Sequence, residues 1–292
     1  MICLFTNLFN KLKTAISGIV CTWTHNTDSD LKCDILLFFA TQTEKEQLEI
    51  GAHEFGFPFK EKSNSQIGSY YDLGTIGPNR VLAVKTRMGA FFHKGSASQA
   101  IVLQATTSAT SIIQLGMAFG IDRDAQNHGD VLISEWLFPY DYRTIEHDAD
   151  EHQEAEGYRI DYNRTTKFRA KQSLINMFDR ERSLGDHTFV VHSGGLLSGG
   201  SRIFSQLFLR KLLFRISSSS GTGGFIGGEM EGVGLLAASN KANPVWIVVK
   251  GISDFADDQR HEEIIERRPE ACLNAVRFVF SALLREETVQ AE

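Results

Sequence analysis

The 292-residue chain has few of the features that mark a disulfide-rich, zinc-binding or membrane-spanning protein. Its four cysteines form no CxxC pair and have no histidines at zinc-ligand spacing, so neither a disulfide framework nor a structural zinc site is expected. No run of apolar residues reaches the roughly 18 that a membrane span requires. Because unpaired thiols are typical of a reducing compartment, we expect a cytoplasmic protein without stable membrane insertion.

The chain also lacks a strong excess of charge. Its 30 Lys and Arg residues stand against 36 Asp and Glu residues, which gives a net charge of −6. This balance offers no overall attraction for DNA or RNA, so no nucleic-acid partner is expected. Neither the GxGxxG fingerprint nor the GxxxxGK[ST] phosphate loop occurs, which argues against dinucleotide-dependent or kinase-type chemistry.

Residues 1–30 differ in pattern from the rest of the chain. Their apolar side chains recur at helical spacing, while asparagines and lysines interrupt them. They lack the unbroken apolar stretch and cleavage site of a signal peptide. We therefore predict an amphipathic helical arm and linker over 1–30, packed on the body or on a neighbouring subunit, and a catalytic domain over 31–292. A helix on a membrane surface is the alternative.

Short β-rich apolar runs alternate with helical segments beyond the arm. Strands are predicted over 35–39, 80–86, 111–115, 131–134, 187–192 and 245–250. Helices are predicted over 44–55, 95–107, 165–178 and 230–242. This alternation predicts a single α/β domain with a mixed central β-sheet flanked by helices. Ligands of such sheets bind beyond the carboxyl ends of the strands.

Glycine-rich segments follow several of these runs, and we predict them to be turns at strand ends. They are 86–89 (TRMG), 116–120 (GMAFG), 193–200 (SGGLLSGG) and 251–254 (GISD). The most informative segment is 227–232 (GGEMEG), in which Glu229 and Glu231 flank Met230. Acids at the start of a helix can be simple helix caps. Asp254, at the end of a buried run, stands where open sheets hold ligands, although it too could be a cap.

Taken together, these segments resemble the nucleoside phosphorylase and methylthioadenosine/S-adenosylhomocysteine nucleosidase superfamily. The resemblance runs from about residue 34 to residue 284. Its matches, in order, are the turn 40–44 (ATQTE), the turn 116–120, the strand 129–134 (GDVLIS), the SGG turn 198–200, the EME signature 229–231 and the ISD motif 252–254.

The resemblance implies a separate role for each of several residues in cleaving a purine N-glycosidic bond. Asp254 matches the acid that protonates purine N7, and Glu231 the carboxylate that holds the ribose hydroxyls. Glu44 matches the carboxylate that positions or deprotonates the attacking water. Met230 would pack against the sugar, Ser253 would support Asp254, and Glu229 would contact the sugar or the water. The remaining expected substrate-binding residues are Arg87, Met88, Gly89, Ala118, Phe119, Gly120, Arg202 and Ile203.

Two departures from the family pattern concern the base pocket. Gly200 replaces the aspartate of the SGD turn, and Arg202 stands where nucleosidases usually carry an aromatic residue that stacks on the purine. Arginine can stack on a purine or contact phosphate, so both roles stay open.

Hydrolysis is favoured over phosphorolysis, because Glu44 occupies the early turn where phosphorylases carry an arginine-bearing glycine loop. Arg87 is the one candidate phosphate ligand near a strand end. Convergence of Arg87, His93, Lys94 and Arg202 would indicate a substrate with 5′-phosphates, whereas Arg210, Lys211 and Arg215 fit a solvated helix face. The sequences of these motifs also resemble those of nucleosidase modules in bacterial antiviral defence systems. Some of these modules degrade ATP or dATP to adenine.

The expected substrate is a purine nucleoside or nucleotide. A methylthioadenosine/S-adenosylhomocysteine salvage nucleosidase, a phosphate-dependent purine nucleoside phosphorylase and a non-catalytic nucleotide sensor are the alternatives. Asp254, Asp257 and Asp258 match no magnesium or calcium loop, so no metal site and no cofactor are expected, except magnesium that accompanies a nucleotide. The resemblance also implies a homo-oligomer.

Overall fold

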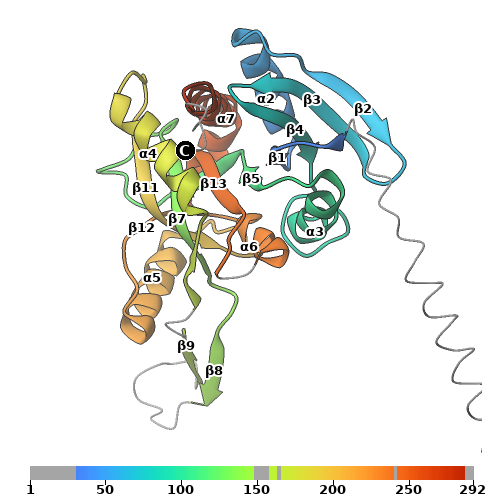
Figure 1. Ribbon diagram of the computed structural model, residues 1–292. Helices are drawn as coiled ribbons and strands as arrows, with labels where there is room; N and C mark the ends of the chain where they lie inside the picture. Colours follow the sequence, from blue (N-terminus) through green and yellow to red (C-terminus); the bar gives the residue numbers. More distant parts are fainter. Residues whose placement is uncertain (1–30, 148–157, 163–165, 240–241, 287–292) are drawn as a thin grey trace, which may run out of the picture.

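A mixed eleven-stranded sheet forms the centre of the computed structural model, which describes residues 31–147, 158–162, 166–239 and 242–286 (Figure 1). The strands follow one another in space as β10-β7-β11-β12-β6-β13-β5-β1-β4-β3-β2, and β7 also pairs with β13. This extra pairing closes β7, β11, β12, β6 and β13 into a ring, beside which the other strands form an open sheet.

The strands are β1 (Ile35–Phe39), β2 (Lys60–Asn64), β3 (Gly68–Ile76), β4 (Asn79–Lys85), β5 (Ser111–Gln114), β6 (Met117–Gly120), β7 (Val131–Pro139), β10 (Phe168–Arg169), β11 (Val191–Ser198), β12 (Phe225–Glu229) and β13 (Trp246–Asp254). A separate hairpin pairs β8 (Thr144–His147) with β9 (Tyr158–Asp161). The helices are α2 (Gln42–Glu54), α3 (Ser96–Thr107), α4 (Gln172–Leu184), α5 (Gln206–Ser220), α6 (Gly232–Leu235) and α7 (Arg260–Leu284), with a 3₁₀ turn at Leu236–Ala238.

Helices cover both faces of the sheet. The long helix α7 packs on β13 and against α2 and α4, while α3 packs against α6 away from them (Figure 1). Every residue of β1 and of β13 is buried, as expected for strands covered on both faces. Parallel pairing of β1 with β4 and β5, and of β5 with β13, brings the carboxyl ends of these strands to the same edge.

The predicted single α/β domain with a mixed central sheet is therefore confirmed. The predicted strand over 187–192 is wrong in its bounds, because β11 begins only at Val191. The predicted helix over 230–242 is also wrong: in 230–239, which the structure describes, the helical residues are those of the four-residue α6 and the 3₁₀ turn. A methyl group on Gly234 would come within 2.1 Å of Ser96 Oγ, so the close approach of α3 depends on this glycine.

Three glycine-rich segments predicted as turns are strands instead. They form β6, most of β11 and the end of β13, and glycines of β11 and of its neighbour β12 make room for aromatic rings. A Cβ atom on Gly195 would come within 2.1 Å of the Trp136 ring, and one on Gly228 within 2.3 Å of the Phe119 ring. Here glycine serves close packing between neighbouring strands rather than a change of chain direction.

The predicted helix over 165–178 begins only at Gln172, since Phe168 and Arg169 pair with β7 as β10. Helix α7, with Pro269 inside it, was not among the predicted elements. The predicted arm over 1–30 lies outside the described residues. Within the described ranges, no helix is both long enough and apolar enough to cross a membrane.

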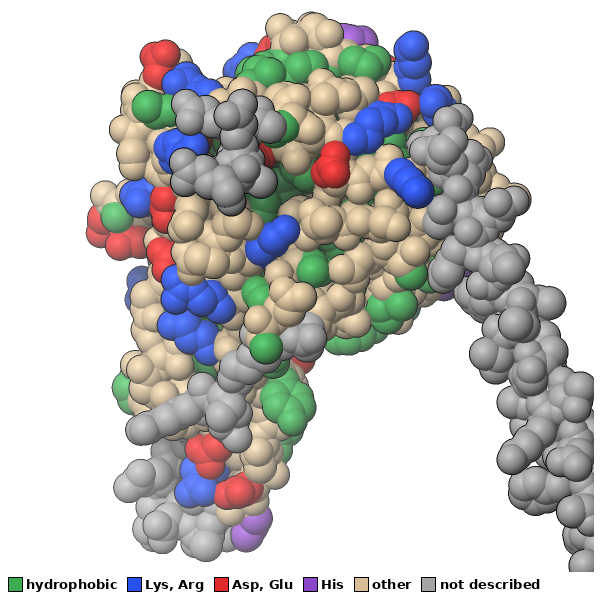
Figure 2. All heavy atoms as spheres, in the orientation of Figure 1, with side chains coloured by type: hydrophobic (Ala, Val, Ile, Leu, Met, Phe, Trp, Pro, Cys, Tyr) green, Lys and Arg blue, Asp and Glu red, His purple; other side chains and the backbone are tan. Residues whose placement is uncertain are grey.

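Basic side chains gather over α5 (Figure 2). The helix buries Leu209, Leu212 and Ile216, and Arg210 and Lys211 lie on its exposed side. The solvated face predicted for Arg210 and Lys211 therefore fits. Arg215 is half-buried and, with Lys211, lines a cavity of about 320 Å³ beside Tyr158 and Tyr162.

Candidate active site

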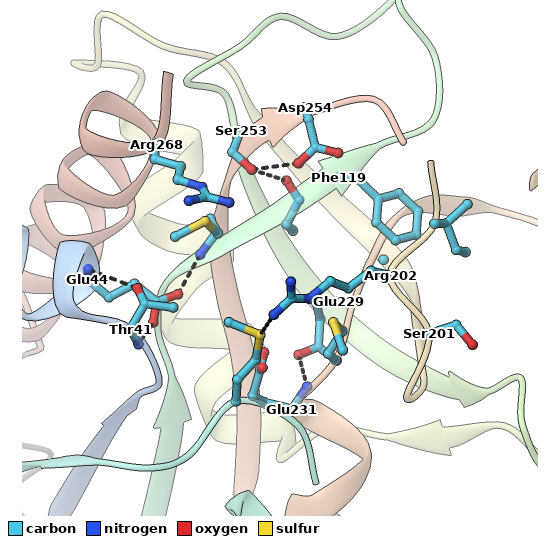
Figure 3. Close-up of a pocket in the computed structure, with 16 residues that line it drawn as sticks. Thr41, Glu44, Phe119, Ser201, Arg202, Glu229, Glu231, Ser253, Asp254 and Arg268 are labelled. Carbon is cyan, nitrogen blue, oxygen red and sulfur yellow. Dashed lines mark hydrogen bonds between the residues drawn. The ribbon is translucent and has the colours of Figure 1, made fainter. Parts of the chain in front are cut away.

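A pocket of about 220 Å³ opens where the β1–α2 turn, β6, β12 and the end of β13 meet (Figure 3). Of the residues expected at the site, the pocket wall contains Glu44, Met88, Ala118, Phe119, Arg202, Ile203, Glu229, Met230, Glu231, Ser253 and Asp254. Segments from both halves of the chain thus converge as the sequence predicts. Arg87, Gly89 and Gly120 lie outside this wall.

Glu44 is fixed by the start of α2. Thr41 is the N-cap, and its side chain and that of Glu44 form a capping box. The backbone N–H groups of Ala40 and Thr41 donate to Glu44 Oε2, both at 2.7 Å, and that of Met117 donates to Oε1 at 3.1 Å. Because each carboxylate oxygen can accept two hydrogen bonds, one acceptor position stays open on Oε1. The cap thereby holds the Glu44 carboxylate in one orientation.

Lys250 is the centre of a buried charge cluster. Its ammonium group, 1% exposed, lies 2.6 Å from Glu231 Oε2 and 3.1 Å from Glu229 Oε2. Glu231 Oε1 also accepts the Gly89 N–H at 3.0 Å. Each oxygen of Glu231 therefore keeps a position that could accept a hydroxyl group of a ligand. Lys250 orients this carboxylate and offsets its charge.

Glu229 has a different environment from Glu231. Its carboxylate accepts hydrogen bonds from Ser198 Oγ at 2.5 Å and from the backbone N–H groups of Glu231 and Gly232, besides the ion pair with Lys250. These bonds use nearly all of its acceptor capacity. The geometry favours a positioning function for Glu229, which holds Lys250 and the first turn of α6, over direct contact with the sugar.

Asp254 is the last residue of β13 and is buried at the pocket wall. Ser253 Oγ donates to Asp254 Oδ2 at 2.9 Å, and the Ala256 N–H donates to Oδ1 at 3.0 Å. The expected support of Asp254 by Ser253 is present in this geometry. Phe119 lies in the same part of the pocket (Figure 3), so a carboxyl group and an aromatic ring face one space.

The charge cluster shifts the pKa values of its members. Burial would lower the pKa of Lys250, but the carboxylates of Glu231, Glu229 and Glu44 outweigh it and raise that pKa. Burial would raise the pKa of Glu231, but Lys250 and the Gly89 N–H outweigh it and lower that pKa. Burial raises the pKa of Glu44, and Lys250 only partly opposes this. The lysine and Glu231 are thus a charged pair at neutral pH.

Gly200 and Arg202, the two departures from the family pattern, each make a distinct contact in the structure. The Gly200 N–H donates to the carboxylate of Asp141, which follows β7, at 2.6 Å, so another acid lies beside the SGG turn. Arg202 reaches across the pocket mouth, where its guanidinium lies 2.8 Å from the thioether sulfur of Met88 (Figure 3). Sulfur is a weak acceptor, so this contact leaves Arg202 able to bind a stronger one.

Sequence reasoning missed Lys250, Thr41, Met117 and Arg268. Lys250 carried a signal, because a lysine inside an apolar strand must find buried acidic partners. Arg268, on α7, lines the pocket wall and could not be associated with it without the course of that helix. No group of three or more His, Cys, Asp or Glu side chains in the described ranges could hold a metal ion.

Gly116→Ala is expected to destabilise the site. Gly116 has φ +133°, and a Cβ atom there would lie 1.9 Å from Oε1 of Glu44, whose carboxylate is held in place by three backbone N–H groups. We expect the free energy of unfolding to fall by at least about 2 kcal/mol. Gly56→Ala is the matched control, since Gly56 also has positive φ (+74°) but nothing within 4 Å of its added methyl group. Equal losses in denaturant unfolding of the two variants would contradict the predicted clash.

Comparisons with known proteins agree with this architecture. The 5′-methylthioadenosine/S-adenosylhomocysteine nucleosidase from Neisseria meningitidis is similar with a TM-score of 0.64 and 18% identity, over 86% of this chain and 98% of that one. The futalosine hydrolase of Helicobacter pylori gives a TM-score of 0.65 and 16% identity, over 87% and 97% of the two chains. At such identities the likeness shows the fold alone.

A curated protein of Amphimedon queenslandica, named Death domain-containing ATP nucleosidase, is 27% identical over 192 residues. The match covers 61% of this chain and 34% of that protein, so the chain spans about a third of the relative's length. A family model described as the phosphorylase superfamily matches residues 39–285, which include every pocket residue described above. The chain therefore belongs to the phosphorylase superfamily.

Proposed function

We propose that this protein is a hydrolase that cleaves the N-glycosidic bond of adenine nucleosides or nucleotides and releases free adenine. The observation that supports this most strongly is the convergence of Asp254, Glu231 and Glu44 in one pocket, with Lys250 buried behind Glu231. Glu231 is held charged, while Asp254 and Glu44 each keep separate hydrogen-bond partners. Acid, sugar-binding and base functions can thus be divided among three carboxyl groups.

In the proposed reaction the bond between C1′ of the sugar and N9 of the purine breaks, and its electron pair stays with the base. Protonated Asp254 donates its proton to N7, so adenine leaves as a neutral molecule. Glu231 accepts hydrogen bonds from the ribose hydroxyls and stabilises the positive charge that develops on the sugar. A water molecule then adds to C1′ and gives its proton to Glu44.

Water is the proposed nucleophile. A phosphate ion would have to lie beside Glu44 and Glu231, whose charges repel it. Lys250 could offset that repulsion only in part, because it is already paired with Glu231 and Glu229. The open acceptor position on Glu44 Oε1 suits a proton of a small neutral nucleophile.

We further propose adenine nucleotides such as ATP or dATP as the substrates, in a nucleotide-depleting effector of antiviral defence. The resemblance of the motifs to defence nucleosidases and the partial match to a protein named as an ATP nucleosidase support this proposal. The effector would act in the cytoplasm as a homo-oligomer. It would need no resident cofactor, and magnesium would enter only with the nucleotide.

The proposal is tested by measuring released base chromatographically from ATP, dATP, adenosine, methylthioadenosine, S-adenosylhomocysteine and inosine, with and without phosphate. Adenine from ATP and dATP in phosphate-free buffer is the expected result. Adenine from the thio-nucleosides alone would indicate a salvage nucleosidase, and strict dependence on phosphate a phosphorylase. Tight nucleotide binding without any released base would indicate a sensor.

The rate is expected to fall as the pH is lowered. Burial raises the pKa of Glu44 above its ordinary value of 4.5, and only the deprotonated carboxylate can accept the proton of water. As the pH falls through this raised pKa, Glu44 becomes protonated and kcat/KM for adenine release decreases. A pH profile of kcat/KM checks this, with circular dichroism at each pH as a control for folding. A profile that stays flat down to the ordinary carboxyl range would exclude Glu44 as the base.

A further inference from the structure

A second cavity of about 630 Å³ adjoins the active-site pocket. Met88 lines both cavities, and Ala40 of the second cavity precedes Thr41 of the first in the chain. The second cavity lies between β3 and the loop of residues 86–95 that follows β4. Its volume is within the range of roughly 300–1,000 Å³ that is usual for small-molecule sites. A ligand in the first pocket can therefore extend past Met88 into the second.

The second cavity is lined by basic side chains and by no acidic one. The basic residues are Lys85, Arg87, His93 and Lys94, and we call this set the basic groove. Among the described residues, none of the four has an acidic partner at ion-pair distance. Lys85 Nζ lies 3.4 Å from the neutral Gln42 Oε1, and the Arg87 guanidinium lies 5.3 Å from the centre of the Phe92 ring. Clustered cations without neutralising acids attract an anionic ligand.

The loop that carries three of these basic residues is tied both to itself and to the active site. Arg87 N–H donates to Lys94 O at 2.7 Å, and Gly95 N–H donates to Phe92 O at 2.7 Å. Gly89 N–H donates to Glu231 Oε1 at 3.0 Å. The loop therefore touches the carboxylate expected to hold the ribose hydroxyls, while its basic side chains line the cavity beyond. A ribose bound at Glu231 would lie beside the entrance to the basic groove.

We propose that the basic groove binds the 5′-phosphates of an adenine nucleotide, so that the pocket selects a nucleotide over a 5′-alkylthio nucleoside. This inference rests on the proposed function, because it uses the same orientation of the sugar. Phosphate oxygens suit these partners, since Arg and Lys form charge-assisted hydrogen bonds with them. An uncharged alkylthio group would gain nothing from the four basic side chains. Arg202, whose guanidinium lies against the Met88 thioether, would exchange that weak acceptor for a phosphate oxygen.

The test is the affinity of the inactive variant Asp254→Asn for adenosine, AMP, ADP and ATP without magnesium, measured by calorimetry. We expect the affinity to rise with the number of phosphates. Adding Arg87→Ala and Lys94→Ala should lower the ratio of ATP affinity to adenosine affinity at least about tenfold, since hydrogen bonds to charged groups are lost. Lys32→Ala is the matched control, because this exposed lysine precedes β1 at the opposite edge of the sheet.

Salt provides an independent measurement. Exposed charge pairs are screened, so raising the ionic strength should weaken ATP binding much more than adenosine binding, and less so in the Arg87→Ala, Lys94→Ala variant. An affinity ratio that stays unchanged in that variant, or tighter binding of methylthioadenosine than of ATP, would overturn the inference. Because binding is measured without turnover, these results are separate from the proposed function, which is tested by adenine release from the wild-type protein.

Discussion

Asp254→Asn is expected to lower kcat/KM for adenine release by about 10²–10⁴-fold, the usual contribution of a general acid. The amide has nearly the same shape as the carboxyl group but cannot transfer a proton to N7. Its oxygen can still accept the Ala256 N–H, and its NH₂ group can donate to the Ser253 hydroxyl, so the end of β13 should keep its conformation. Initial rates of adenine release, together with thermal unfolding, check both parts of the prediction.

Ser253→Ala is the informative companion variant. It removes the hydroxyl that donates to Asp254 Oδ2 but leaves the acid itself, so the rate should fall much less than in Asp254→Asn. A wild-type-like rate in Asp254→Asn would remove this residue from the acid role. An equally large fall in Ser253→Ala would mean that the orientation of the side chain, rather than its proton, limits the reaction.

Lys250→Met is expected to destabilise the protein by about 3–5 kcal/mol, because breaking a buried ion pair leaves an uncompensated charge. Methionine fills a similar volume, so the loss would come from electrostatics rather than from a cavity. Glu231 and Glu229 would be left buried without their cation, and Glu231 would no longer be held in one orientation. We expect adenine release to be lost as well. Denaturant unfolding and the rate assay measure the two effects separately.

Two further variants separate the buried charge from other causes. Lys32→Met exchanges an exposed lysine in the same way and should change the free energy of unfolding by less than about 0.5 kcal/mol. Combining Lys250→Met with Glu231→Gln removes one of the unpaired charges and should restore part of the lost stability. If Lys250→Met unfolds like the wild type, or if the second substitution lowers stability further, the buried ion pair does not stabilise the site.

The strands that lead to the site could be predicted because burial on both faces makes them continuous apolar runs. The run at 35–39 gives β1, and the run at 245–250 extends through the ISD motif to Asp254. The convergence of Glu44, Glu231 and Asp254 followed from ordered motifs, each at or near a strand end. In these cases local pattern and long-range structure agree.

The contacts that determine the packing and charge of the site could not be predicted in the same way. Glycine-rich segments are typical of turns, whereas here Gly195 and Gly228 make room for Trp136 and Phe119 from neighbouring strands. The pairing of Lys250 with Glu231 depends on the register between distant segments, although a lysine within an apolar strand is itself a signal. The basic groove likewise requires β3 and the 86–95 loop to face each other.

The most direct test of water-driven cleavage of a nucleotide is a ³¹P NMR measurement on protein, ATP and inorganic phosphate, with adenine followed in parallel. The proposed reaction leaves the triphosphate intact, so its three resonances should persist and the inorganic phosphate signal should stay constant while adenine accumulates. Consumption of inorganic phosphate with a new sugar 1-phosphate signal would show phosphorolysis instead. Growth of the inorganic phosphate signal without adenine would show hydrolysis of the triphosphate and contradict N-glycosidic cleavage.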